Sequence, residues 1–308
     1  MNAKDDGPDG RYPDDQVVAG AVVVGVDGSE DSLRAVRYAL REANNWDKDL
    51  LIAHAIDDSI LAGAWGVTYD PTMLADAGAE VADQSRVYAI EQGIAPERVR
   101  SEVFLGNSAA VLCRLSDHAH TVVVGRRAKS GLERLFVGST SVSLAGSGQC
   151  PVIMVSAATN PERTGGKGVI GVGIDNTDRS KEALRYAFVE ATRRGARVLA
   201  VHAFEVNRPF FADDAQVERR AAEQSVAAEE GTRALLAPFE AEFPGTETEL
   251  RVVRSHPVDE LLARTREVDL LVLGVQGLGV PGVSPGGTIR AVMAHAEAPL
   301  ALVRHARR

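Results

Sequence analysis

Two glycine-rich stretches hold the residues of this chain that are best suited to chemistry. One reads Gly274-Val275-Gln276-Gly277 and is followed, after nine residues, by Gly287-Thr288. The other reads Gly125-Arg126-Arg127-Ala128 and is followed, across the same gap, by Gly138-Ser139. Glycine lets a backbone approach an anion closely, and a helix that opens on Gly-Ser or Gly-Thr offers N–H groups and a hydroxyl to negative charge. Both stretches therefore predict phosphate binding.

Apolar runs position these stretches. Val122-Val123-Val124 and Leu270-Leu271-Val272-Leu273 directly precede them and read as buried parallel strands. In the first half, further strands are predicted over 21–26, 50–56, 99–105 and 151–155, with helical periodicity between them. Such alternation predicts an α/β fold with a parallel sheet and helices on both faces. Ligands of these sheets bind beyond the carboxyl ends of the strands, so Asp27, Ala55 and Gly125 should converge there.

The whole pattern is present twice. Three residues of the first half recur 148 positions later, and both motif glycines recur 149 positions later; the pairs are Asp27 and Asp175, His54 and His202, Pro151 and Pro299, Gly125 and Gly274, and Gly138 and Gly287. This duplication predicts two domains, over residues 20–156 and 168–304. They are joined by a linker over 157–167 and preceded by a polar arm over 1–19 that we expect to be disordered.

Composition limits the class of protein. A chain of 308 residues with 45% hydrophobic content is long enough for two cores, and its net charge of −9 argues against general nucleic-acid binding. No apolar run approaches the roughly 18 residues that span a bilayer, and the acidic N-terminus lacks the layout of a signal peptide. We therefore expect a cytoplasmic protein without a membrane span. Cys113 and Cys150 are too few for a disulfide scaffold.

Several of these features together resemble one family. They are the aspartate after the first strand, the His54-Ala55 pair in the second, the G-x2-G-x9-G-[S/T] motif, and the closing Cys-Pro-Val and Ala-Pro-Leu strands. The combination resembles the universal stress proteins, in the tandem form common in actinobacteria, over 20–156 and 168–304. The resemblance implies the ATP-binding subclass, with two tandem doubly wound, five-stranded parallel-sheet domains of the adenine-nucleotide α-hydrolase-like fold.

The resemblance also implies roles for individual positions. Asp27 and Asp175 would contact the ribose and adenine end, and Ala55 and Ala203 would offer backbone groups to the adenine. The glycine loops and the following helix starts would hold ribose and phosphates, which implies two ATP sites per chain, with Mg²⁺ accompanying the nucleotide and no separate metal site. The expected binding residues are Gly25, Asp27, Ala55, Val124, Gly125, Arg126, Arg127, Ala128, Lys129, Gly131, Gly138, Ser139 and Thr140 in the first half, and Gly173, Asp175, Ala203, Leu273, Gly274, Val275, Gln276, Gly277, Gly279, Gly287, Thr288 and Ile289 in the second.

The two sites should differ. Ala128 stands where the family pattern has its second glycine, and loop 125–139 carries four cations (Arg126, Arg127, Lys129 and Arg134) against one acid, Glu133. Loop 274–288 carries no charged residue. We therefore expect the first half to bind ATP through charge, and the second through backbone N–H groups and the Thr288 hydroxyl. The histidines at 54 and 202 lie inside apolar strands and read as core residues with a satisfied hydrogen bond.

Three functions fit this pattern. We favour a nucleotide-dependent stress or dormancy regulator that acts on a regulatory protein partner the sequence does not identify, because no catalytic motif such as G-x-S-x-G or H-E-x-x-H occurs. The second is an ATP pyrophosphatase or adenylyl transferase of the same superfamily. The third is a scaffold that binds no nucleotide. Asp27 alone would equally suit a helix cap, and its recurrence as Asp175 favours a ligand role.

Assembly is predicted from the last strand of each half. The apolar segments 152–155 and 300–303 read as short sheet edges, which need a cover. We expect the two edges of one chain to pair about a pseudo-two-fold axis, and such units to form a homodimer.

Overall fold

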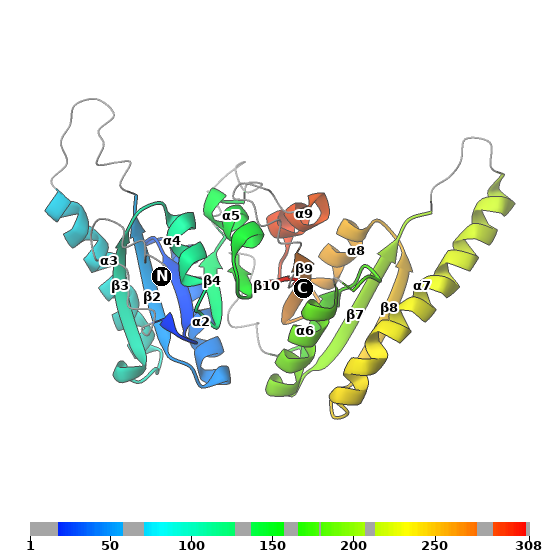
Figure 1. The fold of residues 1–308 in the computed structure, drawn as a ribbon, viewed down its shortest axis with the longest axis horizontal. Coiled ribbons are helices and arrows are strands. Elements are labelled where there is room, and N and C mark those ends of the chain that lie inside the picture. The colour runs from blue at the N-terminus through cyan, green and yellow to red at the C-terminus, as the bar shows by residue number, and fades with distance from the viewer. Residues whose placement is uncertain are drawn as a thin grey trace, which may run out of the picture.

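A computed structural model describes residues 18–57, 71–126, 137–156, 166–178, 180–206, 213–275 and 286–305. Each half contains five strands that alternate with helices (Figure 1). The first half comprises β1 (Val22–Val26), α2 (Glu30–Trp46), β2 (Leu50–Ile56), α3 (Pro71–Glu91), the short 3-10 helix η2 (Pro96–Arg98), β3 (Val99–Leu105), α4 (Ser108–Leu115), β4 (Thr121–Gly125), α5 (Ser139–Ser147) and β5 (Val152–Val155). The second comprises β6 (Val169–Gly173), α6 (Ser180–Arg194), β7 (Arg197–Phe204), α7 (Asp214–Glu242), β8 (Thr248–Arg254), α8 (Pro257–Arg264), β9 (Leu270–Val275), α9 (Gly287–His295) and β10 (Leu300–Arg304).

All ten strands belong to one sheet, in the order β3-β2-β1-β4-β5-β10-β9-β6-β7-β8. Pairing is parallel within each half. In the first half, β2 and β3 follow on one side of β1, and the chain then crosses to add β4 and β5 on the other side. In the second half, β7 and β8 lie on one side of β6, and β9 and β10 lie on the other. The strand order therefore reverses between β1 and β4 and between β6 and β9. The predicted doubly wound α/β fold is confirmed, and it places one topological switch point in each half.

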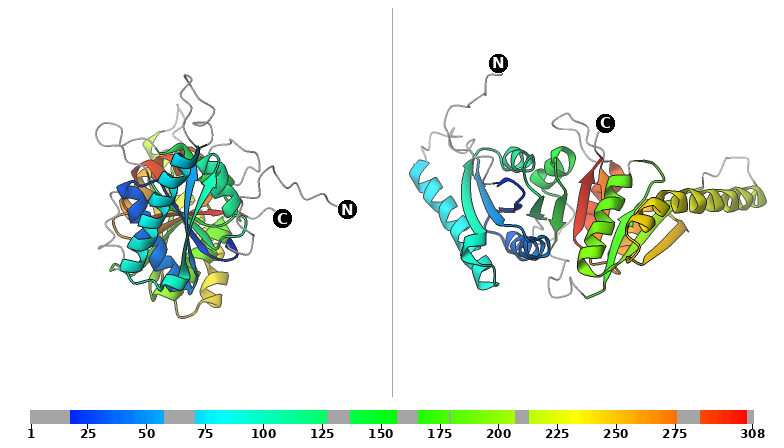
Figure 2. Two further views of the ribbon diagram at one scale, coloured as in Figure 1. Left: turned by 90° about the vertical axis from the view of Figure 1, so that its left-hand side faces the viewer. Right: turned by 60° about the horizontal axis from the view of Figure 1, so that its bottom comes forward.

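Two layers of helices cover the sheet, as the views in Figures 1 and 2 show. Alternate strand residues divide between two cores: Val22 and Val24 belong to the core with α2 and α6, whereas Val23 belongs to the core with α4, α5, α8 and α9. Both cores run through the two halves without a break. This follows from the near-continuous apolar runs, since a central parallel strand is buried on both faces.

The start of α2 shows how sequence fixes local structure. The Ser29 side chain accepts a hydrogen bond from the Ser32 N–H at 3.2 Å, and Glu30 and Asp31 occupy the first turn, where the helix dipole favours acids. The helix ends at Asp47, whose φ of 51° is left-handed. The helix therefore begins directly after the Asp27 turn at the edge of the sheet.

The two halves meet at strands β5 and β10. These strands pair antiparallel, with Ala301 opposite Ile153 and Leu302 opposite Val152. The predicted pairing of the two apolar edges within one chain is confirmed. The paired residues are buried, and the pairing joins two five-stranded sheets into one.

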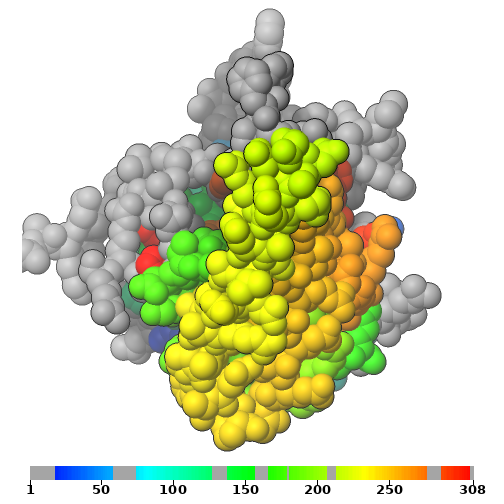
Figure 3. Space-filling model, turned by 90° about the vertical axis from the view of Figure 1, so that its right-hand side faces the viewer, coloured from blue at the N-terminus to red at the C-terminus, as the bar shows by residue number. Residues whose placement is uncertain are grey.

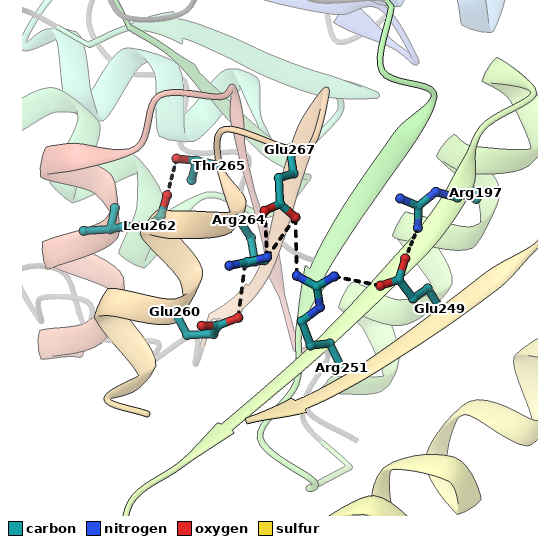
Figure 4. Close-up of polar contacts among 8 residues, drawn as sticks. All are labelled: Arg197, Glu249, Arg251, Glu260, Leu262, Arg264, Thr265 and Glu267. Atoms are coloured by element: carbon teal, nitrogen blue, oxygen red, sulfur yellow. Dashed lines mark hydrogen bonds and ion pairs between the residues drawn. The ribbon is translucent and has the colours of Figure 1, made fainter. Parts of the chain in front are cut away.

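The far end of the second half carries its charges in a chain of ion pairs. Helix α7 forms a long ridge along β8, as Figure 3 shows. Leu250 of β8 packs into the core with α7, so its neighbours Glu249 and Arg251 belong to the other face of the strand. There, alternating charges link β7, β8 and α8 in the sequence Arg197, Glu249, Arg251, Glu267, Arg264 and Glu260 (Figure 4). Arg251 lies in the middle, 2.9 Å from Glu249 and 3.4 Å from Glu267. Charged side chains on an edge strand such as β8 disfavour pairing with another chain.

In the described ranges, no helix is both long enough and apolar enough to cross a bilayer. Those ranges also hold no group of three or more His, Cys, Asp or Glu side chains suited to a metal ion. Cys113 and Cys150 are free thiols.

Candidate functional site

A cleft of about 200 Å³ opens at the carboxyl ends of β1, β2 and β4. Asp27, Ala55 and Gly125 line it together, as the strand pattern predicts. The start of α5 closes one side and α4 closes another. The lining residues are Gly25, Val26, Asp27, Ser29, Asp31, Ser32, Ala53, Ala55, Ser108, Val111, Leu112, Val124, Gly125, Gly138, Ser139, Thr140 and Ser141.

The second half has its own cleft, of about 420 Å³, at the matching edge of the sheet. Asp175, Ala203 and Gly274 line it, and α9 replaces α5. The lining residues are Gly173, Ile174, Asp175, Ser180, Val201, His202, Ala203, Pro257, Leu261, Leu273, Gly274, Thr288 and Ile289. The duplication has therefore built two clefts from equivalent elements.

The two aspartates hold equivalent turns. Asp27 Oδ1 accepts hydrogen bonds from the Ser29 N–H at 3.0 Å and from the Ser29 hydroxyl at 2.5 Å. Asp175 Oδ1 accepts from the Thr177 N–H at 3.1 Å and from its hydroxyl at 2.7 Å. Asp27 is not the helix cap, since Ser29 caps α2. Each carboxylate instead shapes the turn between strand and helix while lining its cleft.

The helices at the motif glycines begin without a side-chain cap. Gly138 precedes α5 and Gly286 precedes α9, and no side chain among the described residues caps either helix start. Side chains cap other helices of the chain, as Asn107 does for α4 and Asp213 for α7. A helix start leaves backbone N–H groups without intrahelical partners, and those groups attract anions. Both clefts therefore present such N–H groups together with a hydroxyl, from Ser139 or Thr288.

A second position in each turn requires left-handed backbone. Gly28 has φ of 77°, and its counterpart Asn176 has φ of 56°. In the second half the Asn176 amide donates to the Ala228 carbonyl at 3.1 Å and accepts from the Thr232 hydroxyl at 2.5 Å. Asparagine adopts this left-handed conformation more readily than most residues with a side chain. Hydrogen bonds of the Asn176 side chain therefore connect the second turn to α7. Gly28 has no side chain that could make such bonds in the first turn.

The strand histidines are satisfied by backbone. The Nδ1 atom of His54 lies 2.9 Å from the Val26 carbonyl oxygen, and the Nδ1 atom of His202 lies 2.8 Å from the Ile174 carbonyl oxygen. Since a carbonyl only accepts, Nδ1 carries the proton in both rings. The predicted hydrogen bond is confirmed, but both histidines are half-buried and not core residues. The sequence did not indicate, however, that His202 lines the second cleft.

Arg126 has an unexpected partner. Its guanidinium donates to the Met293 carbonyl of α9 at 2.6 Å, and the residue does not line the first cleft. Burial lowers the pKa of Arg126, and the nearby Asp31 carboxylate offsets part of that shift. The first loop therefore sends one of its four cations across to the second half.

The remaining predicted residues fall into two groups. Val275 is buried in the core, and Gly287 opens α9. The others lie outside the described residues, namely Arg127, Ala128, Lys129, Gly131, Gln276, Gly277 and Gly279. Sequence reasoning missed Asp31 and Ser32 of α2 and the apolar wall of Val111 and Leu112. The sequence predicts the apolar helical face that contains Val111 and Leu112, but it does not predict that this face lines the cleft.

A substitution at Gly125 tests the close packing of β4 against the start of α2. A Cβ at this position would lie 2.6 Å from the Asp31 carbonyl oxygen, which is backbone and cannot rotate away. We expect Gly125→Ala to lower the free energy of unfolding by about 1–3 kcal/mol, as overpacking does elsewhere. Urea denaturation measures this, with Gly166→Ala as control because nothing lies within 4 Å of a Cβ there. Equal midpoints for the two variants would show that β4 and α2 do not pack as described.

Comparison with known proteins agrees with this architecture. The model of the universal stress protein family matches residues 20–156 and 168–304. A universal stress protein of Mycolicibacterium smegmatis is 31% identical over 298 residues, covering 92% of this chain and 96% of the relative. One of Mycobacterium tuberculosis is 27% identical over 301 residues, covering 92% and 96%.

A crystal structure shares the fold. A universal stress protein from Archaeoglobus fulgidus superposes with a TM-score of 0.64 at 17% identity, covering 93% of this chain and 98% of that one. At this identity the likeness supports the fold alone. The sequence matches extend over both halves, and on their evidence the chain belongs to the universal stress protein family.

Proposed function

We propose that each half of this chain binds one adenine nucleotide, ATP, and that the protein is a nucleotide-dependent stress regulator. The observation that carries the proposal is the pair of equivalent clefts, each with an aspartate turn at one side and an uncapped helix start at the other. A nucleotide needs this combination, because its ribose offers hydroxyl donors and its phosphates need N–H groups.

The residues present fit such a ligand. Asp27 or Asp175 would accept from the ribose, and the backbone beside Ala55 or Ala203 would contact the adenine. Gly125 or Gly274 would let the chain approach the phosphates, and Ser139 or Thr288 would bond them at the helix start. Mg²⁺ would enter bound to the phosphates, since it takes most of its ligands from phosphate and water in sites of this kind.

The proposal makes the protein a binder rather than a dedicated enzyme. Mass analysis of the nucleotide released by denaturing the purified chain, together with an ATP turnover assay, tests this. We expect released ATP and turnover far below the 1–10³ s⁻¹ of typical enzymes. Rapid turnover with a carboxylate or sulfur substrate would favour a pyrophosphatase or adenylyl transferase. A chain that neither carries nor takes up nucleotide would favour a scaffold.

Salt should distinguish the two sites. The first loop retains Arg127, Lys129 and Arg134 as cations for phosphate once Arg126 is committed to α9. Each would contribute about 1 kcal/mol of attraction that salt screens, whereas the second loop is uncharged. Calorimetry on Asp175→Ala, which leaves the first site intact, and on Asp27→Ala, its counterpart, should show a steeper loss of ATP affinity in the former between about 50 and 500 mM salt. Parallel losses would show that the loop charges do not act on the nucleotide.

The same proposal covers the organisation of the chain. Its binding units would be residues 20–156 and 168–304, with 157–167 as linker and 1–19 as an arm. A homodimer of such tandem units, a cytoplasmic location and an interaction with a regulatory protein complete the proposal.

A further inference from the structure

A cluster of buried polar side chains joins α2 of the first half to α6 of the second. We call it the joint cluster, and it comprises Tyr38, Glu42, Trp46, Tyr186, Glu190 and Arg194. The two glutamates are equivalent by the duplication, and so are the two tyrosines. Residue 46 and its counterpart 194 are Trp in one half and Arg in the other.

Glu190 is fully satisfied. Arg194 Nε donates to its Oε2 at 2.8 Å, with Arg194 Nη2 at 2.6 Å from the same oxygen. Trp46 Nε1 donates to Oε1 at 2.8 Å from across the joint. With a side chain that is 0% exposed, this carboxyl group is buried and has a cation and an indole as partners. Both of its oxygens therefore accept hydrogen bonds.

Glu42 is not satisfied in the same way. Its Oε1 accepts from Arg194 Nη2, but Oε2 is buried and has no hydrogen-bond partner among the described residues. Its side chain is 1% exposed, so bulk solvent does not reach it. A buried carboxylate oxygen without a donor is costly when charged, and a proton removes that charge. One guanidinium thus contacts two carboxylates, of which only one is fully paired.

We propose that Glu42 holds a proton at Oε2 in the assembled chain near neutral pH, and that losing this proton weakens the joint between the two halves. The ionised pair would place two negative charges beside one guanidinium in a site closed to water, where repulsion between like charges is poorly screened. The joint cluster would then oppose the β5–β10 pairing that it now supports.

The neighbouring titratable groups agree with this assignment. Burial raises the pKa of Glu42 to about 7, Arg194 and the nearby Tyr38 hydroxyl offset part of that rise, and Glu190 adds to it. Burial also raises the pKa values of Tyr38 and Tyr186, so both phenols stay neutral.

Two cations and a histidine lie further out. Arg193 stacks on the Trp46 ring, 4.0 Å from its centre, and donates to the Asn45 carbonyl. Burial and the charge of Lys48 lower the pKa of His120, whose ring packs on Trp46 with centroids 4.3 Å apart. The pKa of His120 therefore lies below the ordinary histidine value, and we assign the charge change near neutral pH to Glu42.

The sign of the effect follows from linkage. The folded pKa of Glu42 is above its value in an unfolded chain, so the folded state binds more protons between the two values. The stabilisation is complete below the unfolded pKa and is lost as pH rises through about 7. We expect the melting temperature to fall on the order of 5 °C from about pH 6 to about pH 8.5 through this group.

Melting curves of the full chain test the proposal. Glu42→Gln places an uncharged amide where the protonated carboxyl lies, so it should melt like the wild type at about pH 6 and higher than the wild type at about pH 8.5. Glu190→Gln removes the paired charge and should lower the melting temperature at both pH values. Glu91→Gln, at an exposed position of α3, should follow the wild type. An unchanged pH dependence in Glu42→Gln would overturn the proposal.

Fluorescence provides a readout that does not need a Glu42 variant to fold. The chain has two tryptophans, Trp46 and Trp65, so Trp65→Phe leaves Trp46 of the joint cluster as the only emitter. Its emission should change with a midpoint near the pKa of Glu42, about 7, and the change should persist in the His120→Gln background. Constant emission from about pH 6 to about pH 8.5 would contradict the proposal.

Discussion

Ala301→Pro is expected to destabilise the whole molecule by about 3 kcal/mol or more. Ala301 lies in β10 between β5 and β9, opposite Ile153, and is fully buried. Proline removes its N–H from the ladder and adds a ring that the neighbouring strands cannot accommodate, whichever of the two strands that N–H faces. Urea denaturation followed by circular dichroism measures the loss, and small-angle scattering shows whether the halves separate.

Ala301→Gly is the matched control for this experiment. It keeps the N–H and costs roughly 0.5–1 kcal/mol through chain entropy. The comparison therefore isolates the main-chain pairing of the joint. If the proline and glycine variants unfolded at the same urea concentration, the pairing of β5 with β10 would not be what holds the two halves together.

Loss of Asp175 is expected to weaken ATP binding in the second half by about 10-fold to 150-fold, which corresponds to the roughly 1.5–3 kcal/mol of a hydrogen bond to a charged group. Asp27→Ala should have the same effect in the first half. The equivalent turns of the two aspartates support this expectation, because both line a cleft through the same geometry. Calorimetry with ATP and Mg²⁺ on each variant measures it.

Asp175 also holds its turn together through Thr177 and Ser180, so a folding defect must be separated from a binding defect. Asp213→Ala likewise removes a carboxylate that holds local structure, since Asp213 accepts from the Gln216 N–H at 2.7 Å at the start of α7. That residue does not line either cleft. Unchanged affinity in Asp175→Ala, or an equal loss in Asp213→Ala, would remove the aspartate from the binding account.

Local patterns were enough to predict the elements and their order. Buried parallel strands read as unbroken apolar runs, Ser29 reads as a cap, and the duplication gives every element a second copy. The pairing of β5 with β10 was also predictable, because each half ends in a short apolar edge strand that needs a cover. The edge strand of the other half is the nearest cover that the chain offers.

The contacts between distant segments could not be predicted in this way. The partner of Arg126 is a carbonyl 167 residues away, and its sequence neighbours made phosphate the more natural partner. Glu42 sits on a helix whose period marks it only as one polar residue among several. Its burial depends on how α2 meets α6, and that depends on the joint between the halves. Such residues acquire their properties from packing that the local sequence does not encode.

The central claim, one ATP in each half, is tested most directly by equilibrium dialysis of the purified chain against labelled ATP with Mg²⁺. We expect saturation near two ATP per chain, and in Asp27→Ala and Asp175→Ala one site of unchanged affinity beside one weakened about 10-fold to 150-fold, because each variant keeps one intact cleft. Absence of saturable binding up to millimolar ATP, a limit that corresponds to about −4 kcal/mol of binding free energy, would contradict it.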